Sequence, residues 1–134
     1  MRLIVLLLAM VSDVSAAEWV KVRGFSEAGI IIYADPATIR RSGDRVKMRD
    51  MYDYKTAQVS GRGKRYLSSK GQSEYDCKNL RARNLFFTRY SGNMGKGNVV
   101  TSIYNSDIKK LDNWDPVAAA TVEETLWKIA CRKQ

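Results

Sequence analysis

The segment Arg45 to Lys55 (RVKMRDMYDYK) alternates between apolar or aromatic residues and charged ones, and this pattern constrains the fold more than any other feature of the chain. Val46, Met48, Tyr52 and Tyr54 would share one face, and Arg45, Lys47, Arg49, Asp53 and Lys55 the other. A period of two predicts a half-buried antiparallel strand. The chain must therefore build a sheet with one apolar face, and that face needs a second layer to cover it.

Turn residues divide the rest of the chain into further short strands. Gly29 to Ala34 (GIIIYA) predicts a buried strand because its centre is β-branched. Asp35-Pro36 is expected to begin a tight turn or one helical turn, and Arg41 to Asp44 a second turn. Further strands are expected at Arg65 to Cys77, interrupted by Gly71, at Leu80 to Tyr90, and at Val99 to Tyr104 as the last one.

The end of the chain changes to a helical period. Thr121 and Glu124 fit a capping box, in which a hydroxyl and a carboxylate satisfy free backbone amides. Val122, Leu126, Ile129 and Ala130 then follow at helical spacing. A helix of about three turns would lay this stripe on the sheet, which makes the fold class α+β, a single antiparallel sheet with a C-terminal helix.

Cys77 and Cys131 are the only cysteines, and they predict one disulfide. The bridge would fasten the C-terminal helix to a strand. In the chain-entropy model, closing a loop of about 54 residues stabilises the fold by roughly 4 kcal/mol. The alternative is a free reactive thiol, which needs an activating group nearby. The chain has no histidine and no CxxC motif to supply one.

The first 17 residues have the pattern of a cleaved signal peptide. A basic start precedes the apolar run Leu3 to Val11, and Ser15 and Ala17 suit the −3 and −1 positions of a cleavage site, with cleavage after Ala16 as the alternative. An uncleaved membrane anchor is the other interpretation, although the run is much shorter than the roughly 20 residues that span a bilayer. No cysteine follows the run to accept a lipid, so we expect no lipoprotein.

Cleavage would leave residues 18–134 as one domain, located in the periplasm or secreted, with association with the cell surface as a further possibility. The rest of the chain holds no second apolar run long enough to cross a membrane. An exported protein with two cysteines also fits an oxidising compartment.

The absence of histidine removes several catalytic chemistries together, including the Ser-His-Asp triad, the Cys-His pair and histidine metal sites. Paired carboxylates remain. Asp50 and Asp53 would point to opposite faces of a strand, and Asp112 and Asp115 flank Trp114 in a loop. We therefore expect no enzyme, no metal and no cofactor, with a histidine-free hydrolase as the alternative.

The chain is strongly basic, with a net charge of +9. This field attracts acidic macromolecules without distinguishing them, and solubility alone could also explain it. The possible basic binding surface comprises Arg62, Lys64, Arg65, Arg81, Arg83 and Arg89. Strand alternation would place Arg81, Arg83 and Arg89 on the face of Leu85 and Phe87, opposite Phe86 and Tyr90. No RNA-binding signature accompanies these residues, and we do not expect a nucleic-acid partner.

The order of features resembles the bacterial surface-adhesin protein E-like family. The matching pieces are Trp19, GIIIYAD, the segment Asp35 to Val46, Met51-Tyr52-Asp53-Tyr54, Tyr75-Asp76-Cys77, Tyr90-Ser91 with its glycine loop, Trp114-Asp115-Pro116-Val117 and Cys131. The resemblance implies a sheet of about six antiparallel strands with a C-terminal helix held by the two cysteines. It further implies an adhesin, since the family's named member is an outer-membrane lipoprotein that forms dimers and binds host matrix proteins.

These observations lead to two hypotheses from different classes. The first is an exported, non-catalytic binding module whose basic surface recognises an acidic protein, glycan or lipid head group. The alternative is a structural or envelope-maintenance protein that acts through homodimerisation and has no specific ligand.

Overall fold

A computed structural model describes residues 18–22, 29–105 and 113–132 of the chain. The expected signal peptide lies outside the described residues. The elements in chain order are β1 (Val20–Lys21), β2 (Ile30–Ser42), β3 (Arg45–Val59), β4 (Arg65–Asp76), β5 (Arg81–Tyr90), the short 3-10 turn η1 (Asn93–Gly95), β6 (Val99–Tyr104), β7 (Asp115–Pro116) and α1 (Val122–Ala130).

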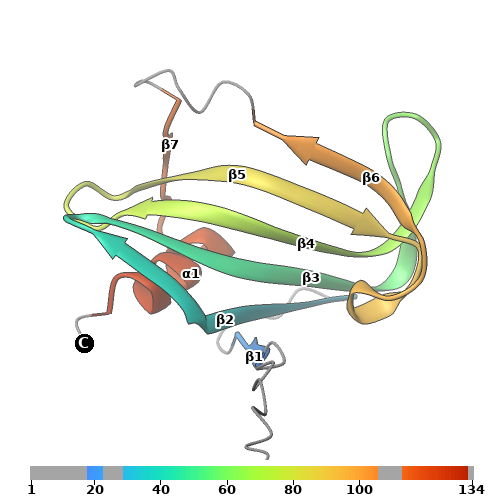
Figure 1. Cartoon of the computed structure of the whole chain (residues 1–134), viewed down its shortest axis with the longest axis horizontal. Helices are drawn as coiled ribbons and strands as arrows, with labels where there is room; N and C mark the ends of the chain where they lie inside the picture. Colours follow the sequence, from blue (N-terminus) through green and yellow to red (C-terminus); the bar gives the residue numbers. More distant parts are fainter. Residues whose placement is uncertain (1–17, 23–28, 106–112, 133–134) are drawn as a thin grey trace, which may run out of the picture.

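The strands form one antiparallel sheet in which β1 to β6 lie in sequence order (Figure 1). Neighbouring strands are also neighbours in the chain, so short hairpins connect most of them; Gly43 has a φ of +61° in the turn between β2 and β3. The predicted fold class is confirmed. Val99 to Tyr104 is not the last strand, however, because the two residues of β7 pair with Arg81 and Ala82 of β5.

The prediction of a turn at Asp35-Pro36 is wrong, because β2 continues past both residues through a bulge. The register with β3 shifts between Asp35 and Arg40. The Thr38 hydroxyl closes the bulge by donating to the Asp35 carbonyl (2.6 Å) and accepting from the Arg49 amide (2.9 Å). Proline has no amide to donate, so the sequence places it where the strand ladder is already broken.

Gly71 does not interrupt β4 but allows the middle of the sheet to pack closely. A Cβ atom built on Gly71 would lie 2.5 Å from the Phe86 carbonyl oxygen and 3.0 Å from the Phe87 Cβ. Gly71 also pairs with Asp50 of β3 across the sheet, so the β4 residue next to Asp50 contributes no side chain.

A bulge in β5 reverses the alternation that the sequence predicts for its arginines. Gln72 pairs with Phe86 and Ser73 with Asn84, so Leu85 is the extra residue. The carbonyls of Asn84 and Leu85 accept hydrogen bonds from the side chain and backbone of Asn105. The prediction that Arg81, Arg83 and Arg89 share a face is therefore wrong. Arg81 and Arg83 lie on the face of Phe86, and Arg89 lies on the face of Phe87.

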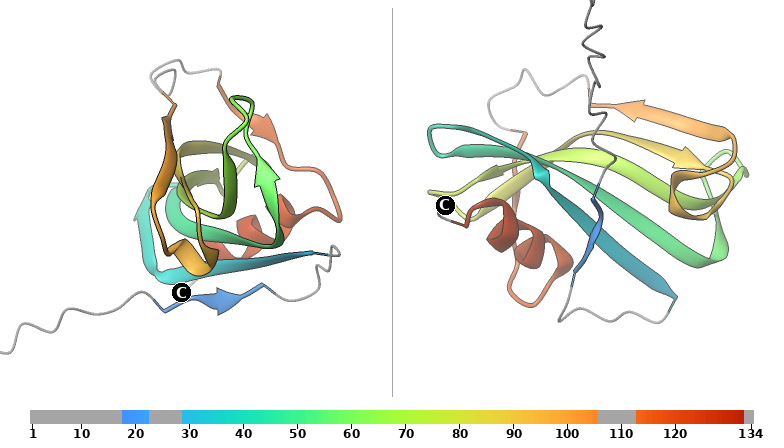
Figure 2. Two further views of the ribbon diagram at one scale, coloured as in Figure 1. Left: turned by 90° about the vertical axis from the view of Figure 1, so that its right-hand side faces the viewer. Right: turned by 60° about the horizontal axis from the view of Figure 1, so that its bottom comes forward.

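Helix α1 packs against one face of the sheet and closes the main hydrophobic core (Figure 2). The Thr121 hydroxyl accepts from the Glu124 amide (3.2 Å), as the capping box predicts, whereas the Glu124 carboxylate accepts from Ala120 (3.4 Å) and not from Thr121. The buried residues of this core are Val22, Ile32, Ala34, Val46, Met48, Tyr75, Val122, Leu126 and Ala130.

The predicted disulfide is confirmed. Cys77, just after β4, is bonded to Cys131 at the end of α1, with 5.5 Å between their Cα atoms. A second connection lies beside it, where the Trp127 indole Nε1 donates to the Asp76 carbonyl (2.8 Å). Both links hold the helix to the end of β4.

Candidate binding surfaces

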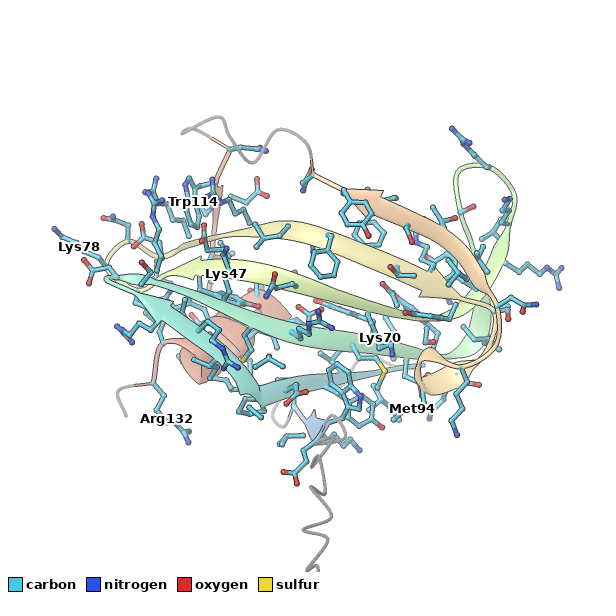
Figure 3. All side chains as sticks on the ribbon, in the orientation of Figure 1. Lys47, Lys70, Lys78, Met94, Trp114 and Arg132 are labelled. Carbon is cyan, nitrogen blue, oxygen red and sulfur yellow. A yellow bond between two sulfur atoms is a disulfide. The ribbon has the colours of Figure 1, made fainter. Side chains whose placement is uncertain are left out.

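The two faces of the sheet differ in what covers them. We call the face beneath α1 the covered face; on β3 it carries Val46, Met48, Asp50, Tyr52 and Tyr54. We call the other the open face; it carries Arg45, Lys47 and Arg49 of β3, Lys70 and Gln72 of β4, and Phe86, Thr88 and Tyr90 of β5. Figure 3 views the open face, with Lys47, Lys70 and Trp114 toward the reader and α1 behind the sheet.

A groove of about 740 Å³ runs along the open face. Basic and aromatic side chains alternate along it, with the Arg49 guanidinium 5.7 Å from the Phe86 ring centroid and the Lys70 ammonium 5.1 Å from that of Tyr90. Trp19 and Arg40 also line the groove. Within the described residues, neither Arg49 nor Lys70 has an ion-pair partner. These charges therefore remain available to an acidic partner.

Asp35 is the buried acid of this groove. Its side chain is on the face of Arg49, with which it pairs in the strand register, and the residue is 2% exposed. Its Oδ1 atom finds no hydrogen-bond partner among the described residues. A buried carboxylate oxygen without a partner is costly, so a hydrogen-bond donor arriving in the groove would have a place to bind.

Arg81 and Arg83 of the predicted basic surface meet at one end of the open face, around Trp114. Their guanidinium carbons lie 4.8 and 4.1 Å from its ring centroid, and that of Arg45 lies 5.4 Å from it. Both predicted residues are already in ion pairs. Arg81 bonds Asp76 at 2.8 Å, and Arg83 bonds Glu74 at 2.6 Å, with both side chains of the latter pair about nine-tenths buried.

The Asp76 carboxylate anchors the turn that leads from β4 to β5. Burial would raise its pKa, but hydrogen bonds from the backbone of Asn79 and Lys78 and from the side chains of Arg81 and Asn79 outweigh burial and lower the pKa to about 2. Asp76 is therefore ionised at neutral pH and offsets the charge of Arg81.

The remaining predicted basic residues lie elsewhere. Arg62 and Lys64 are exposed in the loop between β3 and β4, and Arg65 is the exposed first residue of β4. Arg89 lies on the covered face, stacked on Tyr66 and Phe87 at 4.5 and 5.0 Å. The structure thus distributes the six residues over three places.

Sequence reasoning missed the cations of the groove itself. Arg49 was visible on the charged face of the alternating strand, but Arg40 stands beside a predicted turn and Lys70 stands singly in the sequence. Only the pairing of β2, β3 and β4 brings them together. It also missed Asp50, although the alternation between Met48 and Tyr52 places this residue on the buried face; it is 5% exposed.

The chain belongs to the surface-adhesin protein E family, whose model matches residues 19–132. The family resemblance of the sequence is thereby confirmed. Among solved structures, crystal form II of Haemophilus influenzae protein E is similar to this chain, with a TM-score of 0.55 and 15% identity over 86% of this chain and 96% of that one. The selenomethionine form of the same protein has a TM-score of 0.54 and 16% identity, covering 80% and 88%. No curated protein sequence matches the chain.

At this level of identity, the solved structures support the fold. The family places the chain among surface adhesins, a class of binding proteins. No helix of the described residues is long and apolar enough to cross a membrane.

Proposed function

We propose that the chain is an exported, non-catalytic binding module that recognises an acidic protein, glycan or lipid head group through the open face of its sheet. One observation carries the proposal: cations without ion-pair partners, Arg49 and Lys70, alternate with aromatic rings along a groove on that face. Arg40 of β2 and Lys47 of β3 pair with each other in the strand register and extend the basic surface along the open face.

Charge and aromatic surface serve different purposes in such a groove. The net charge of +9 draws polyanions to the whole molecule without specifying where they bind. The rings of Trp19, Phe86 and Tyr90 supply apolar contact area beside the cations. Sugar rings, acyl chains and protein side chains can all use that area, so the groove suits an acidic macromolecule better than a small inorganic anion.

The experiment compares two double variants that remove the same charge. Lys47→Gln/Arg49→Gln changes the open face, and Arg62→Gln/Lys64→Gln changes the loop that the sequence also marks as basic. Heparin serves as the polyanionic probe, and the NaCl concentration that elutes each protein from it is the readout. We expect the open-face variant to elute at a clearly lower NaCl concentration than the wild type. The loop variant should elute at nearly the same NaCl concentration as the wild type.

An equal shift for both variants would mean that net charge alone binds heparin, and a larger shift for the loop variant would move the binding surface there. Either result contradicts the open-face proposal. Vesicles of anionic phospholipid replace heparin in a parallel measurement, which separates lipid head groups from glycans as the partner.

A second candidate function, assembly through homodimerisation, is favoured by strand β6. Among the described strands it pairs with β5 alone, and its residues Val99, Ile103 and Tyr104 are 60%, 37% and 72% exposed. An apolar edge strand can pair with a second copy of itself. Sedimentation velocity of the wild type and of Ile103→Lys tests this: dimerisation that Ile103→Lys abolishes supports it, and a wild-type monomer at high concentration rejects it.

A further inference from the structure

A second pocket lies on the covered face, next to α1, and its chemistry is opposite to that of the open face. Its volume is about 360 Å³, within the range of small-molecule sites. The pocket is lined by hydrogen-bond acceptors from three elements and by the rings of several tyrosines. Two arginines also line it: Arg83, which is paired with Glu74, and Arg89. The argument rests on Asp50, Asn84, Glu123, Tyr52, Tyr54 and Tyr66.

Asp50 is the buried acid of this pocket. The residue is 5% exposed, and no hydrogen bond or ion pair reaches its carboxylate within the described part of the chain. Burial, and then the charge of Glu123 on α1, raise its pKa from 3.8 to about 7. Gly71, which pairs with Asp50, contributes no side chain of its own, and Phe87 of β5 lies against its backbone.

Asn84 adds a second acceptor. Its Nδ2 donates to the carbonyls of Gln72 and Phe86, which fixes Oδ1 as the free end of the amide. That Oδ1 atom is buried and has no hydrogen-bond partner among the described residues. Asp50, Asn84 and Glu123 thus present oxygen acceptors to one pocket, and a ligand that matches them must bring N–H donors and positive charge.

The aromatic rings of the pocket suit the same charge. Tyr54 and Tyr66 meet edge to face with 5.7 Å between their centroids. The Arg89 guanidinium already lies 4.5 Å above the Tyr66 ring, so these rings hold a cation within the fold. In the strand register Arg89 is two residues beyond Phe87, the partner of Gly71, and it lies toward the end of the pocket away from Asp50.

We propose that this pocket binds an organic cation: a protonated amine on a small apolar body, with the ammonium at Asp50, Asn84 and Glu123 and the body against the tyrosine rings. The site is separate from the open face. It would prefer cations, whereas the net charge of +9 makes the molecule as a whole attract anions. An anion should be attracted by the protein as a whole, and a cation by this pocket alone.

Three probes with the same apolar body test the proposal by isothermal titration calorimetry at pH 8: 3-phenylpropylamine as the cation, 3-phenylpropanol as the neutral compound and 3-phenylpropionate as the anion. We expect the amine to bind at least tenfold more tightly than the other two. Asp50→Asn, which keeps the side-chain shape, should weaken amine binding about tenfold, and Glu123→Gln, at an exposed helical position, a few-fold.

Arg49→Gln is the matched control. This variant removes a charge from the open face. It should weaken heparin binding by that face and leave amine binding by the pocket unchanged. The two proposals can therefore fail independently. If Asp50→Asn does not fold, as judged by its thermal melt, Glu123→Gln and the pH profile of the wild type decide.

The pH profile follows from the groups that face Asp50, which are Glu123 from α1, Tyr52 from β3 and Tyr75 from β4. Burial raises the pKa of both tyrosines, so they stay neutral, and Asp50 must lose its proton to receive the amine. Amine affinity should fall about tenfold from pH 8 to pH 6. Equal binding of the amine and the carboxylate, or an unchanged affinity in Asp50→Asn, would overturn the proposal.

Discussion

At the residue scale, Asp50 is a carboxyl group buried in the apolar face of a strand. It interrupts the apolar face of β3 between Met48 and Tyr52, and it is buried like Met48, whereas Tyr52 is half-buried. A lone buried carboxylate without a hydrogen-bond partner destabilises a small domain when it is charged. The protein keeps the carboxylate uncharged over much of the acidic range by holding its proton.

The raised pKa of Asp50 makes stability depend on pH. The folded chain holds the Asp50 proton up to about pH 7, while the unfolded chain releases it near 3.8. The unfolded state therefore binds fewer protons between these values, and the free energy of unfolding should fall as pH rises, by on the order of 1 kcal/mol per pH unit, and level off above pH 7.

Asp50→Asn should remove this contribution. Urea denaturation of both proteins at pH 4.5, 6 and 7.5 measures it, since all other titrating groups are shared and cancel in the difference. We expect the variant to gain stability relative to the wild type as pH rises. Parallel pH profiles for the two proteins would show that Asp50 titrates normally in the fold.

At the scale of elements, the position of α1 depends on its packing against two strands and on two links at its C-terminal end. It contacts β2 and β3 through an apolar stripe, and its nine residues are too few to be stable as an isolated helix. The bridge from Cys77 to Cys131 and the Trp127–Asp76 hydrogen bond hold its C-terminal end. The pocket beside Asp50 takes Glu123 and Leu126 from this helix and therefore depends on the same attachment.

Removing the bridge should lower the free energy of unfolding by about 4 kcal/mol, because the unfolded chain regains the freedom of a long loop. The double variant Cys77→Ser/Cys131→Ser is compared with the wild type by urea denaturation. A reducing agent should bring the wild type to the stability of the variant and leave the variant unchanged. A variant as stable as the oxidised wild type would contradict this prediction.

On the scale of the whole molecule, the two faces of one sheet suit ligands of opposite charge. The open face gathers cations and rings, and the covered face holds carboxylates and tyrosines beneath the helix. The β5 bulge changes which residues belong to each face, since it places Arg83 and Arg89 on different faces. One small domain thus offers two chemically distinct sites.

Export remains a prediction, and mass spectrometry of the protein from its native host tests it. We expect a mature chain that begins at Glu18 and weighs less than the reduced chain by the two hydrogen atoms lost on forming the bridge. Cell fractionation then distinguishes the periplasm, the surface and the medium. A full-length chain with free thiols would contradict both export and oxidation in the host.

Local patterns predicted the main strands, the helix and the disulfide, because these depend on periodicity along the chain and on a cysteine count that allows one pairing. They predicted neither the two-residue strand β7 nor the continuation of β2 past Asp35. The alternation of β3 and the spacing of α1 are local patterns, and both predicted faces are the ones that are buried. Thr121 was likewise identifiable as the N-cap from its neighbours alone.

The places where the strands shift register, and the side chains that meet across the sheet, depend on contacts between residues far apart in the chain. The bulges at Asp35 to Arg40 and at Leu85 arise from side-chain and backbone hydrogen bonds to distant residues, Arg49 and Asn105, which no local pattern encodes. A shift of one residue moves every later side chain to the other face. For that physical reason the arginines of β5 were assigned to one face by sequence and to two by the fold, and both candidate sites became visible only in three dimensions.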